Sequence, residues 1–299
     1  VISFISQSGA LGSAVLDWAG NKGYGINKFV SYGNAQNVDE AELLEFLAED
    51  PSTKVIAIYA EGIKDGKKFM AVARRVTQKK PVIIIKGGMS EEGGRAASSH
   101  TGSLAGNAQV FNAMVKQTGL VLAHSMQEVF DFARVFASEP KPKGKRVQII
   151  TNGGGYGVLT ADAISDVKLT LAQMSEERRK PIRAASPTYA VIQNPMDLTG
   201  DADNARFMVA LENTLLDGNV DAVILIILFQ VPTLDSDIVE GVSQLLTRRK
   251  KPVLIMSAGG EFAQLHMKLL EKEGINTFGE PKDAAAARGL GQHERLAVP

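Results

Sequence analysis

The chain has 299 residues, which is enough for two domains of ordinary size. Its 33 lysines and arginines balance its 33 aspartates and glutamates, so the charge gives no indication of a nucleic-acid partner. There is no cysteine, which excludes disulfides, thiol catalysis and cysteine-bound metal.

The hydrophobic pattern predicts a globular protein without a membrane partner. The longest apolar run, residues 222–229, is far shorter than the roughly 20 residues of a membrane-spanning helix. The lack of cysteine fits a cytoplasmic location. Because the chain opens on a strand pattern, VISFISQ, with neither methionine nor signal peptide, we expect it to be a piece of a longer polypeptide.

Short β-branched runs alternate with amphipathic helices in the first half of the chain. The strand patterns are VISFIS at 1–6, KFVSYG at 28–33, KVIAIYAEG at 54–62 and PVIIIKGG at 81–88, and the clearest helical patterns cover 39–50 and 67–78. Strands this apolar, alternating with helices, indicate a parallel sheet that is covered on both faces.

The second half repeats this design. Residues 139–146 lie in the basic and proline-containing stretch SEPKPKGKR and are predicted to be a linker. After it, VQIITNGGGYGVLTADAI repeats the strand, loop and helix of VISFISQSGALGSAVLDWA, with a period of roughly 150 residues. We therefore predict an α/β protein of two successive flavodoxin-like, doubly wound parallel-sheet domains, at 1–138 and 147–290, and a loose tail at 291–299.

Two matching loops are candidates for binding phosphate. In FISQSGALG and TNGGGYGVL a strand runs through small residues into a helix, whose N-terminus offers free N–H groups and about half a positive charge. Neither loop has the pattern of a P-loop or of a dinucleotide site. The alternative is a glycine turn that only lets the helix pack on the strand. The candidate phosphate-binding residues are Ser6, Ser8, Gly9, Asn152, Gly153, Gly154 and Gly155.

A single histidine lies among small residues in AASSHTGSLAGNA, and we expect this stretch to be a loop. A neutral imidazole is a nucleophile near pH 7, so His100 is a candidate carrier of a phosphoryl group. Its neighbours Ser99, Thr101 and Gly102 can donate hydrogen bonds to phosphate oxygens. The alternative is that His100 caps the following helix or faces solvent. That helix is expected to turn Val110 inward with its other apolar residues.

Glu61 follows a strand, at the end where open α/β sheets place their sites. A carboxylate there can hold one imidazole nitrogen and leave the other as the nucleophile, although an ordinary loop acid is the alternative. Asn194 and Asp197, in QNPMDLTG, either support the site or form a local turn. No histidine or carboxylate pairing predicts a metal site.

The motifs together resemble one family. FISQSGALG, YAEGIKDGKKF, KPVIIIKGG, SHTGSLAG, TNGGGYGVL and NPMDLTG are similar to the alpha-subunit-like region of the ADP-forming acyl-CoA synthetases, or acetate–CoA ligases, in the succinyl-CoA ligase superfamily. The resemblance implies a reversible reaction in which acyl-CoA, ADP and phosphate give a carboxylic acid, CoA and ATP through a phosphohistidine. It implies that His100 is that histidine, that Glu61 orients it, and that the loops at Ser8 and Gly153 are opposite anion cradles.

The resemblance also implies partners that this sequence lacks. The family has a Rossmann-type CoA-binding domain and an ATP-grasp domain, the latter on the same chain or on a beta subunit. We therefore expect CoA, ADP or ATP and phosphate as substrates, Mg²⁺ with the nucleotide in the ATP-grasp domain, and no cofactor bound in this chain. A homo- or hetero-oligomer is expected. The sequence does not determine which acyl group is used, nor whether the nucleotide is ADP or GDP.

Two other interpretations compete. Some protein-lysine acetyltransferases contain a similar ligand-sensing regulatory region, but that class typically lacks the histidine that is present here. A bare α/β scaffold for subunit assembly would leave the SHTG stretch without a purpose.

Overall fold

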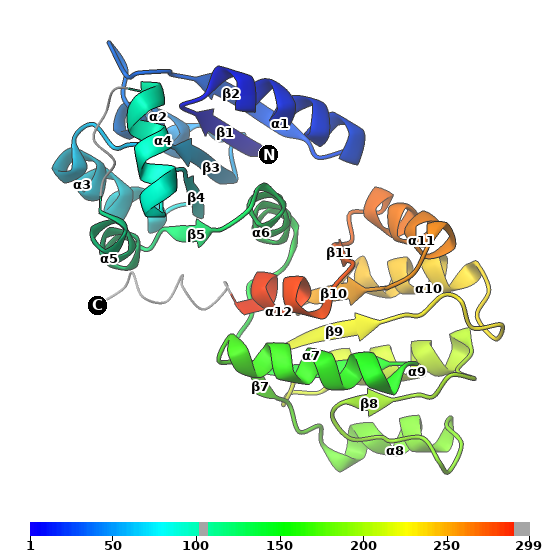
Figure 1. The fold of residues 1–299 in the computed structure, drawn as a ribbon. Coiled ribbons are helices and arrows are strands. Elements are labelled where there is room, and N and C mark those ends of the chain that lie inside the picture. Colours follow the sequence, from blue (N-terminus) through cyan, green and yellow to red (C-terminus); the bar gives the residue numbers. More distant parts are fainter. Residues whose placement is uncertain (102–106, 290–299) are drawn as a thin grey trace. The chain divides into compact units, whose positions relative to one another are not determined.

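The computed structural model describes residues 1–101 and 107–289 (Figure 1). These residues form two compact units, one from Val1 to Ala137 and one that begins at Ser138. Each unit is built on one sheet of parallel strands, with five strands in the first and six in the second. The predicted fold class is therefore confirmed.

The first unit has the strand order β2-β1-β3-β4-β5, so that β1 lies inside the sheet and the chain winds to either side of it. Its elements are β1 (Ile2–Ser6), α1 (Gly9–Lys22), β2 (Ile26–Ser31), α2 (Glu40–Glu49), β3 (Val55–Ala60), α3 (Gly66–Thr77), β4 (Val82–Lys86), α4 (Glu91–Thr101), α5 (Ala108–Thr118), β5 (Val121–Ala123) and α6 (Met126–Ser138).

Apolar residues on both faces of the central strands pack this unit. One face is covered by α2, α3 and α5, whose Leu44, Phe69 and Phe111 join Ile58 in a buried cluster. On the other face Phe130 of α6 contacts Phe4 and the Trp18 ring of α1, with Phe130 and Trp18 ring centroids 4.6 Å apart. Because both faces are covered, the central strands β3 and β4 are apolar at nearly every position, as the sequence predicted.

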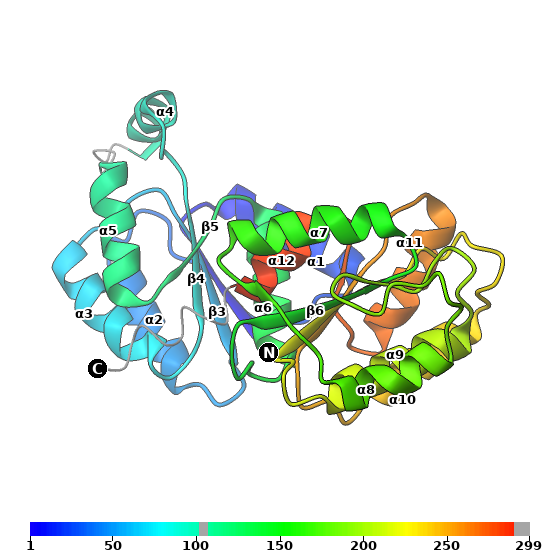
Figure 2. The same ribbon diagram turned by 90° about the horizontal axis from the view of Figure 1, so that it is seen from below.

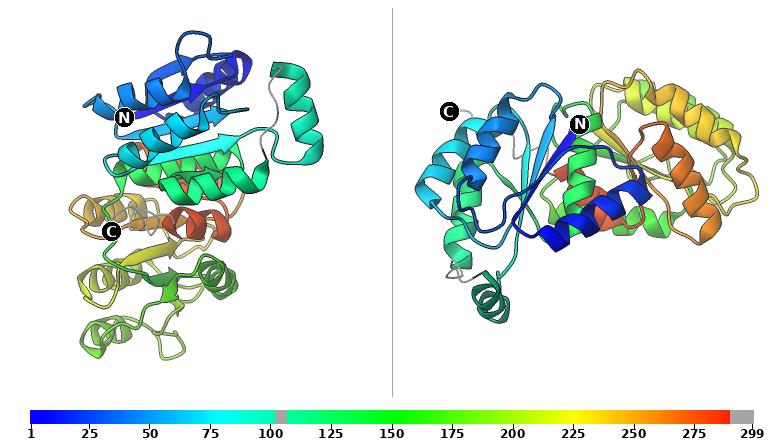
Figure 3. Two further views of the ribbon diagram at one scale, coloured as in Figure 1. Left: turned by 90° about the vertical axis from the view of Figure 1, so that its left-hand side faces the viewer. Right: turned by 90° about the horizontal axis from the view of Figure 1, so that it is seen from above.

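Helix α4 lies apart from these two layers, as Figures 2 and 3 show. It contains the backbone of His100, which was expected to lie in a loop. That expectation was wrong for the residues up to Thr101, which are helical. Glu91 and Glu92 lie in its first turn, where acidic side chains favour the positive helix end, and alanine residues favour its interior.

The second unit has the strand order β11-β10-β9-β6-β7, and β8 pairs with β6. Its elements are β6 (Arg146–Thr151), α7 (Gly154–Asp166), β7 (Thr170–Leu171), α8 (Glu176–Ala184), β8 (Met196–Asp197), α9 (Asn204–Leu216), β9 (Ala222–Ile226), α10 (Asp237–Leu246), β10 (Val253–Met256), α11 (Glu261–Lys272), β11 (Thr277–Phe278) and α12 (Pro281–Gly289).

The core of the second unit lies between its sheet and the helices α8, α9 and α10. Ile182, Phe207 and Val242 of these helices are fully buried against Leu225 of β9. Helices α7 and α12 contact one another away from this cluster. The strand β9 is therefore enclosed, which explains the uninterrupted apolar run that the sequence shows there.

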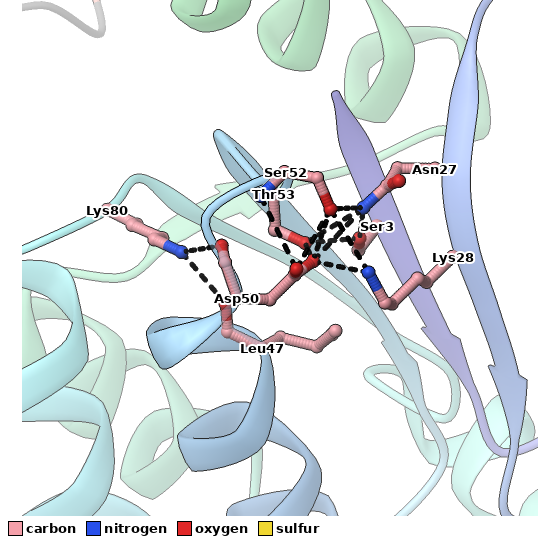
Figure 4. A network of polar contacts seen from close by, with 8 residues as sticks. All are labelled: Ser3, Asn27, Lys28, Leu47, Asp50, Ser52, Thr53 and Lys80. Atoms are coloured by element: carbon pink, nitrogen blue, oxygen red, sulfur yellow. Dashed lines mark hydrogen bonds and ion pairs between the residues drawn. The ribbon is translucent and has the colours of Figure 1, made fainter.

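A polar network links the starts of β1 and β2 to the end of α2 (Figure 4). The Asp50 carboxylate accepts hydrogen bonds from the Lys28 ammonium at 2.6 Å, from Asn27 at 3.1 Å and from the Thr53 hydroxyl. The Lys80 ammonium donates to the Asp50 carbonyl at 2.6 Å, next to the end of α2. The Lys28 ammonium and then the Thr53 hydroxyl hold the pKa of Asp50 well below its usual range.

This network predicts a pH-dependent loss of stability in Asp50→Asn. A carboxyl with a lowered native pKa stabilises the fold above its unfolded pKa of about 3.9, and that contribution is lost as the pH falls toward the native pKa. We expect the variant to have a Tm a few degrees lower than wild type at pH 7, with a difference that shrinks below about pH 4.

Thermal unfolding followed by circular dichroism from pH 3 to pH 7 measures this difference. Glu49→Gln is the matched control, because Glu49 pairs with Lys79 on the surface and both side chains are more than half exposed. A difference for Asp50→Asn that is no larger than the control, or that does not change with pH, would contradict the assignment.

Candidate functional site

The carboxyl ends of β1, β3 and β4 meet at one edge of the first sheet. Ser6 pairs with Tyr59, and Ala60 pairs with Lys86, so the three strands end at nearly the same level. Gln7 joins two of these ends, because its Oε1 accepts the N–H of Glu61 at 2.6 Å and of Gly62 at 3.1 Å. Gln7 was not predicted from the sequence, where its only signal is a polar residue directly after a buried strand.

The predicted residues Ser6, Ser8 and Gly9 lie together at the N-terminus of α1. Ser8 caps the helix and accepts the Leu11 N–H at 3.3 Å, and the buried Ser6 hydroxyl donates to the Ser8 carbonyl at 2.7 Å. Ser6 therefore shapes the loop. The first turn of α1 contains no acidic residue, so the positive end of the helix is not neutralised there and can bind an anion.

Glu61 is 7% exposed, and one of its carboxylate oxygens has no donor among the described residues. Its Oε1 accepts the Tyr59 hydroxyl at 3.1 Å. Its Oε2 is buried and has no hydrogen-bond partner among the residues that the structure describes. A buried acceptor without a donor costs stability, so this oxygen is a natural place for an incoming N–H group.

Tyr59 and Lys86 complete the surroundings of Glu61, and the sequence analysis did not select either of them. The Lys86 ammonium donates to the Glu61 carbonyl at 3.1 Å and to the Gly87 carbonyl at 2.8 Å. Burial lowers the pKa of Lys86, and the charge of Glu61 acts in the opposite direction. A Cβ at Gly87 would lie 3.1 Å from the Tyr59 hydroxyl, so a glycine leaves room for the Tyr59–Glu61 pair.

The predicted phosphoryl-carrying segment is described only in part. The backbones of Ser99, His100 and Thr101 lie in the last turn of α4. Gly102 and the side chains of those three residues lie outside what the structure describes. Their contacts with phosphate therefore stay predictions. The following helix α5 begins at Ala108, and Val110 is 68% exposed, so the expectation that it points into the core was wrong.

The glycine loop of the second unit differs from the loop at α1. Gly153 precedes α7 and provides no side-chain cap, while the Thr151 hydroxyl bonds the Gly153 N–H at 2.9 Å. Asn152 is 2% exposed. Its amide accepts the Leu228 N–H at 2.9 Å and donates to the Leu228 carbonyl at 3.1 Å. The Asn152 side chain thus holds two strand ends together. Gly155 has open space where a side chain would begin.

Asp197 lies against the first turn of α7. Its Oδ2 is 2.5 Å from the position that a Cβ at Gly154 would occupy, so glycine is needed there. Its Oδ1 accepts the Thr199 N–H at 2.9 Å. The positive end of α7 therefore already faces a carboxylate, unlike that of α1. Asn194 accepts the Ile149 N–H at 3.1 Å and donates to two carbonyls, so it braces β6.

Two kinds of feature are absent from residues 1–101 and 107–289. No group of three or more histidine and acidic side chains is arranged to hold a metal ion in this part of the chain. Over the same residues, no helix is both long enough and apolar enough to cross a membrane.

Comparison with known proteins gives a separate family match for each of the two units. Residues 1–136 match the model of the succinyl-CoA ligase like flavodoxin domain, and residues 147–287 match that of the Ligase-CoA domain. The alpha subunit of acetate–CoA ligase [ADP-forming] II from Pyrococcus furiosus is 43% identical over 96% of this chain. The chain belongs to the ADP-forming acyl-CoA synthetase family. It spans 63% of the length of that relative.

Members of this family differ in the acid for which they are named. A 4-hydroxybutyrate–CoA ligase [ADP-forming] from Nitrosopumilus maritimus is 37% identical over 75% of the chain, which covers 32% of that protein. Among solved structures, dinucleotide forming acetyl-coenzyme A synthetase 1 from Ca. Korarchaeum cryptofilum, in complex with phosphate and ADP, matches with a TM-score of 0.94 at 34% identity. The match covers 99% of the chain described here and 65% of the Korarchaeum chain.

The Tyr59–Glu61 contact predicts a shifted phenol titration. Burial, and then the charge and hydrogen bond of Glu61, raise the pKa of Tyr59 to about 12. In Glu61→Gln the charge is lost but the burial stays, so we expect a pKa below 12 that is still above the ordinary value of about 10.

Carbon-13 NMR titration of labelled tyrosine measures this pKa. Tyr189 is the internal control, because its hydroxyl bonds Asp201 in the second unit and should titrate alike in both proteins. An unchanged Tyr59 titration in Glu61→Gln would show that the two groups do not interact.

Proposed function

We propose that this chain is the phosphohistidine-carrying part of an ADP-forming acid–CoA ligase, and that His100 carries the phosphoryl group. The complete enzyme interconverts acyl-CoA, ADP and phosphate with a carboxylic acid, CoA and ATP. The proposal combines the family of the chain with the chemistry at the carboxyl ends of β1, β3 and β4.

The observation that carries the proposal is the Oε2 of Glu61, which has no donor within the part of the chain that the structure describes. Its neighbours Tyr59 and Gln7 hold the side chain and the backbone of Glu61, so this oxygen is a fixed acceptor at the edge of the sheet. An imidazole N–H bonded to a fixed carboxylate has its other nitrogen free as a nucleophile. Gln7, whose side chain accepts the Glu61 N–H, directly precedes the Ser8 cap of α1. The N-terminus of α1 supplies positive charge for the phosphoryl oxygens.

The reaction consists of three substitutions, and in each of them one bond forms as another breaks. A phosphate oxygen attacks the thioester carbon, the C–S bond breaks, and CoA leaves as the thiol after it takes up the proton of the phosphate. The imidazole nitrogen of His100 then attacks phosphorus, and the P–O bond to the acyl group breaks to release the carboxylate. Finally an ADP oxygen attacks phosphorus, the P–N bond breaks, and ATP leaves with the free imidazole restored.

The proposal requires parts beyond this chain. We infer that a CoA-binding Rossmann domain supplies the thioester and that an ATP-grasp domain or beta subunit supplies ADP with Mg²⁺, in a homo- or hetero-oligomer. The chain itself binds phosphate or acyl phosphate through α1 and, in the second unit, through the backbone at Gly153, Gly154 and Gly155. The Asp197 carboxylate beside α7 makes anion binding at that helix N-terminus weaker than at the N-terminus of α1. A cytoplasmic location stays a prediction.

The regulatory interpretation is not favoured. Two similar proteins that match nearly all of the chain are named as a ligase subunit and as a synthetase.

Phosphoryl labelling tests the proposal. The complete enzyme is incubated with γ-labelled ATP and Mg²⁺ and mapped by mass spectrometry at basic pH, which preserves phosphohistidine. We expect acid-labile label on His100, none in His100→Asn, and labelling at least about 100-fold slower in Glu61→Gln.

His124→Asn is the matched control, because His124 is an exposed histidine in the same unit and should leave the labelling unchanged. No label in the assembled wild-type enzyme, or label that survives His100→Asn, would refute the proposal.

A further inference from the structure

A cavity of about 350 Å³ opens beside Glu61 in the first unit. Three of its lining residues are Gln7, which follows β1, Gly62, which follows β3, and Lys86, which ends β4. Gln7 directly precedes the cap of α1, and Gly62 directly follows Glu61. The cavity therefore adjoins both groups that the proposed phosphoryl chemistry uses. Its size is that of a small-molecule site.

One wall of the cavity is apolar. Ile63, Met70, Val110, Phe111 and Met114 come from the loop after β3, from α3 and from α5. Phe111 and Met114 belong to the buried core, whereas the Val110 side chain is largely exposed on the same helix. Methionine side chains adapt to differently shaped ligands and contact aromatic rings favourably. Such a wall suits a hydrocarbon group, and its side chains offer no hydrogen-bond partner to a second charged group on a ligand.

The other notable group in the cavity is the Lys86 ammonium, on a residue that is 7% exposed. An ammonium has three donors, and Lys86 uses two of them on the carbonyls of Glu61 and Gly87. The remaining donor has no hydrogen-bond acceptor among the described residues. Glu40 also lines the cavity, but its Oε1 accepts the Lys64 N–H at 2.9 Å, and burial raises its pKa. Lys64 also lines the cavity, but it is exposed to solvent, whereas Lys86 is buried. Lys86 is therefore the buried cation there that suits a carboxylate.

We propose that this cavity binds the substrate acid, a monocarboxylate with an apolar group larger than acetate, with its carboxylate at Lys86 and its hydrocarbon part against Val110, Phe111 and Met114. The inference rests on the proposed function, since it names the acid that the ligase uses. A carboxylate at Lys86 lies at the same sheet edge as Glu61 and the N-terminus of α1, where the acyl phosphate would form. Acetate alone would leave most of 350 Å³ unfilled.

The test compares two acids in two tryptophan variants of the complete enzyme. Val110→Trp narrows the cavity from a side chain that is 68% exposed, so the fold can accept it. Asn112→Trp places the same bulk on the same helix, at an exposed position that does not line the cavity. For Val110→Trp we expect kcat/KM with phenylacetate to fall roughly 10- to 200-fold and that with acetate to change by less than about threefold. Asn112→Trp should change neither.

Three results would overturn the inference. Equal losses for both acids, together with slower labelling of His100 from ATP, would show that the cavity serves the phosphoryl step itself. No loss with either acid would show that the acid binds elsewhere. Equal effects of the two tryptophans would show a non-specific effect on α5.

A binding measurement separates this inference from the proposed function. Sodium phenylacetate is added to the chain with labelled methionine methyl groups, and the shifts of Met70 and Met114 are followed by NMR. We expect shifts in wild type that are lost in Val110→Trp and much smaller with sodium acetate. If His100 takes no label but these shifts occur, the ligase proposal fails and the acid site stands. If His100 takes label but the shifts are absent, the acid site fails alone.

Discussion

The site depends on the tie that Gln7 makes between the ends of β1 and β3. One side-chain oxygen accepts two neighbouring backbone N–H groups, those of Glu61 and Gly62. These N–H groups lie beyond the last ladder pair of the strands, where backbone groups would otherwise need water or another partner. The bond fixes where the chain leaves β3, and so it fixes the Glu61 carboxylate relative to the N-terminus of α1.

The two units use the same strand, loop and helix for different local chemistry. In the first, Ser8 caps α1 and no acid neutralises the first turn. In the second, the Asp197 carboxylate from β8 lies against α7, where only a glycine leaves room for it. A helix N-terminus that already faces a carboxylate attracts a second anion less strongly. The internal repeat therefore preserves the backbone of strand, loop and helix. Side chains from other strands determine how strongly each helix N-terminus attracts an anion.

Two buried charged side chains of the first unit lie at its carboxyl edge. Glu61 and Lys86 are both 7% exposed, and each loses hydration that its few hydrogen bonds only partly replace. Their burial is a cost in the free protein, which a substrate or an imidazole would offset on binding. The network around Asp50 lies at the start of β3 and is fully bonded instead, and so stabilises the fold.

Periodicity and punctuation in the sequence were enough to predict the fold class and the repeated strand, loop and helix, because apolar spacing directly reflects burial in a two-sided parallel sheet. The short strands β5, β7, β8 and β11 were not predicted. Glu61 and the loop at Ser8 could be chosen because strand ends mark the sites of such sheets. The roles of Gln7, Tyr59 and Lys86 were decided only by tertiary structure, since their partners are set by which strands lie side by side. The exposure of Val110 and the helix around His100 were likewise beyond local pattern, because tertiary packing selects which face of a helix is covered and small residues allow either loop or helix.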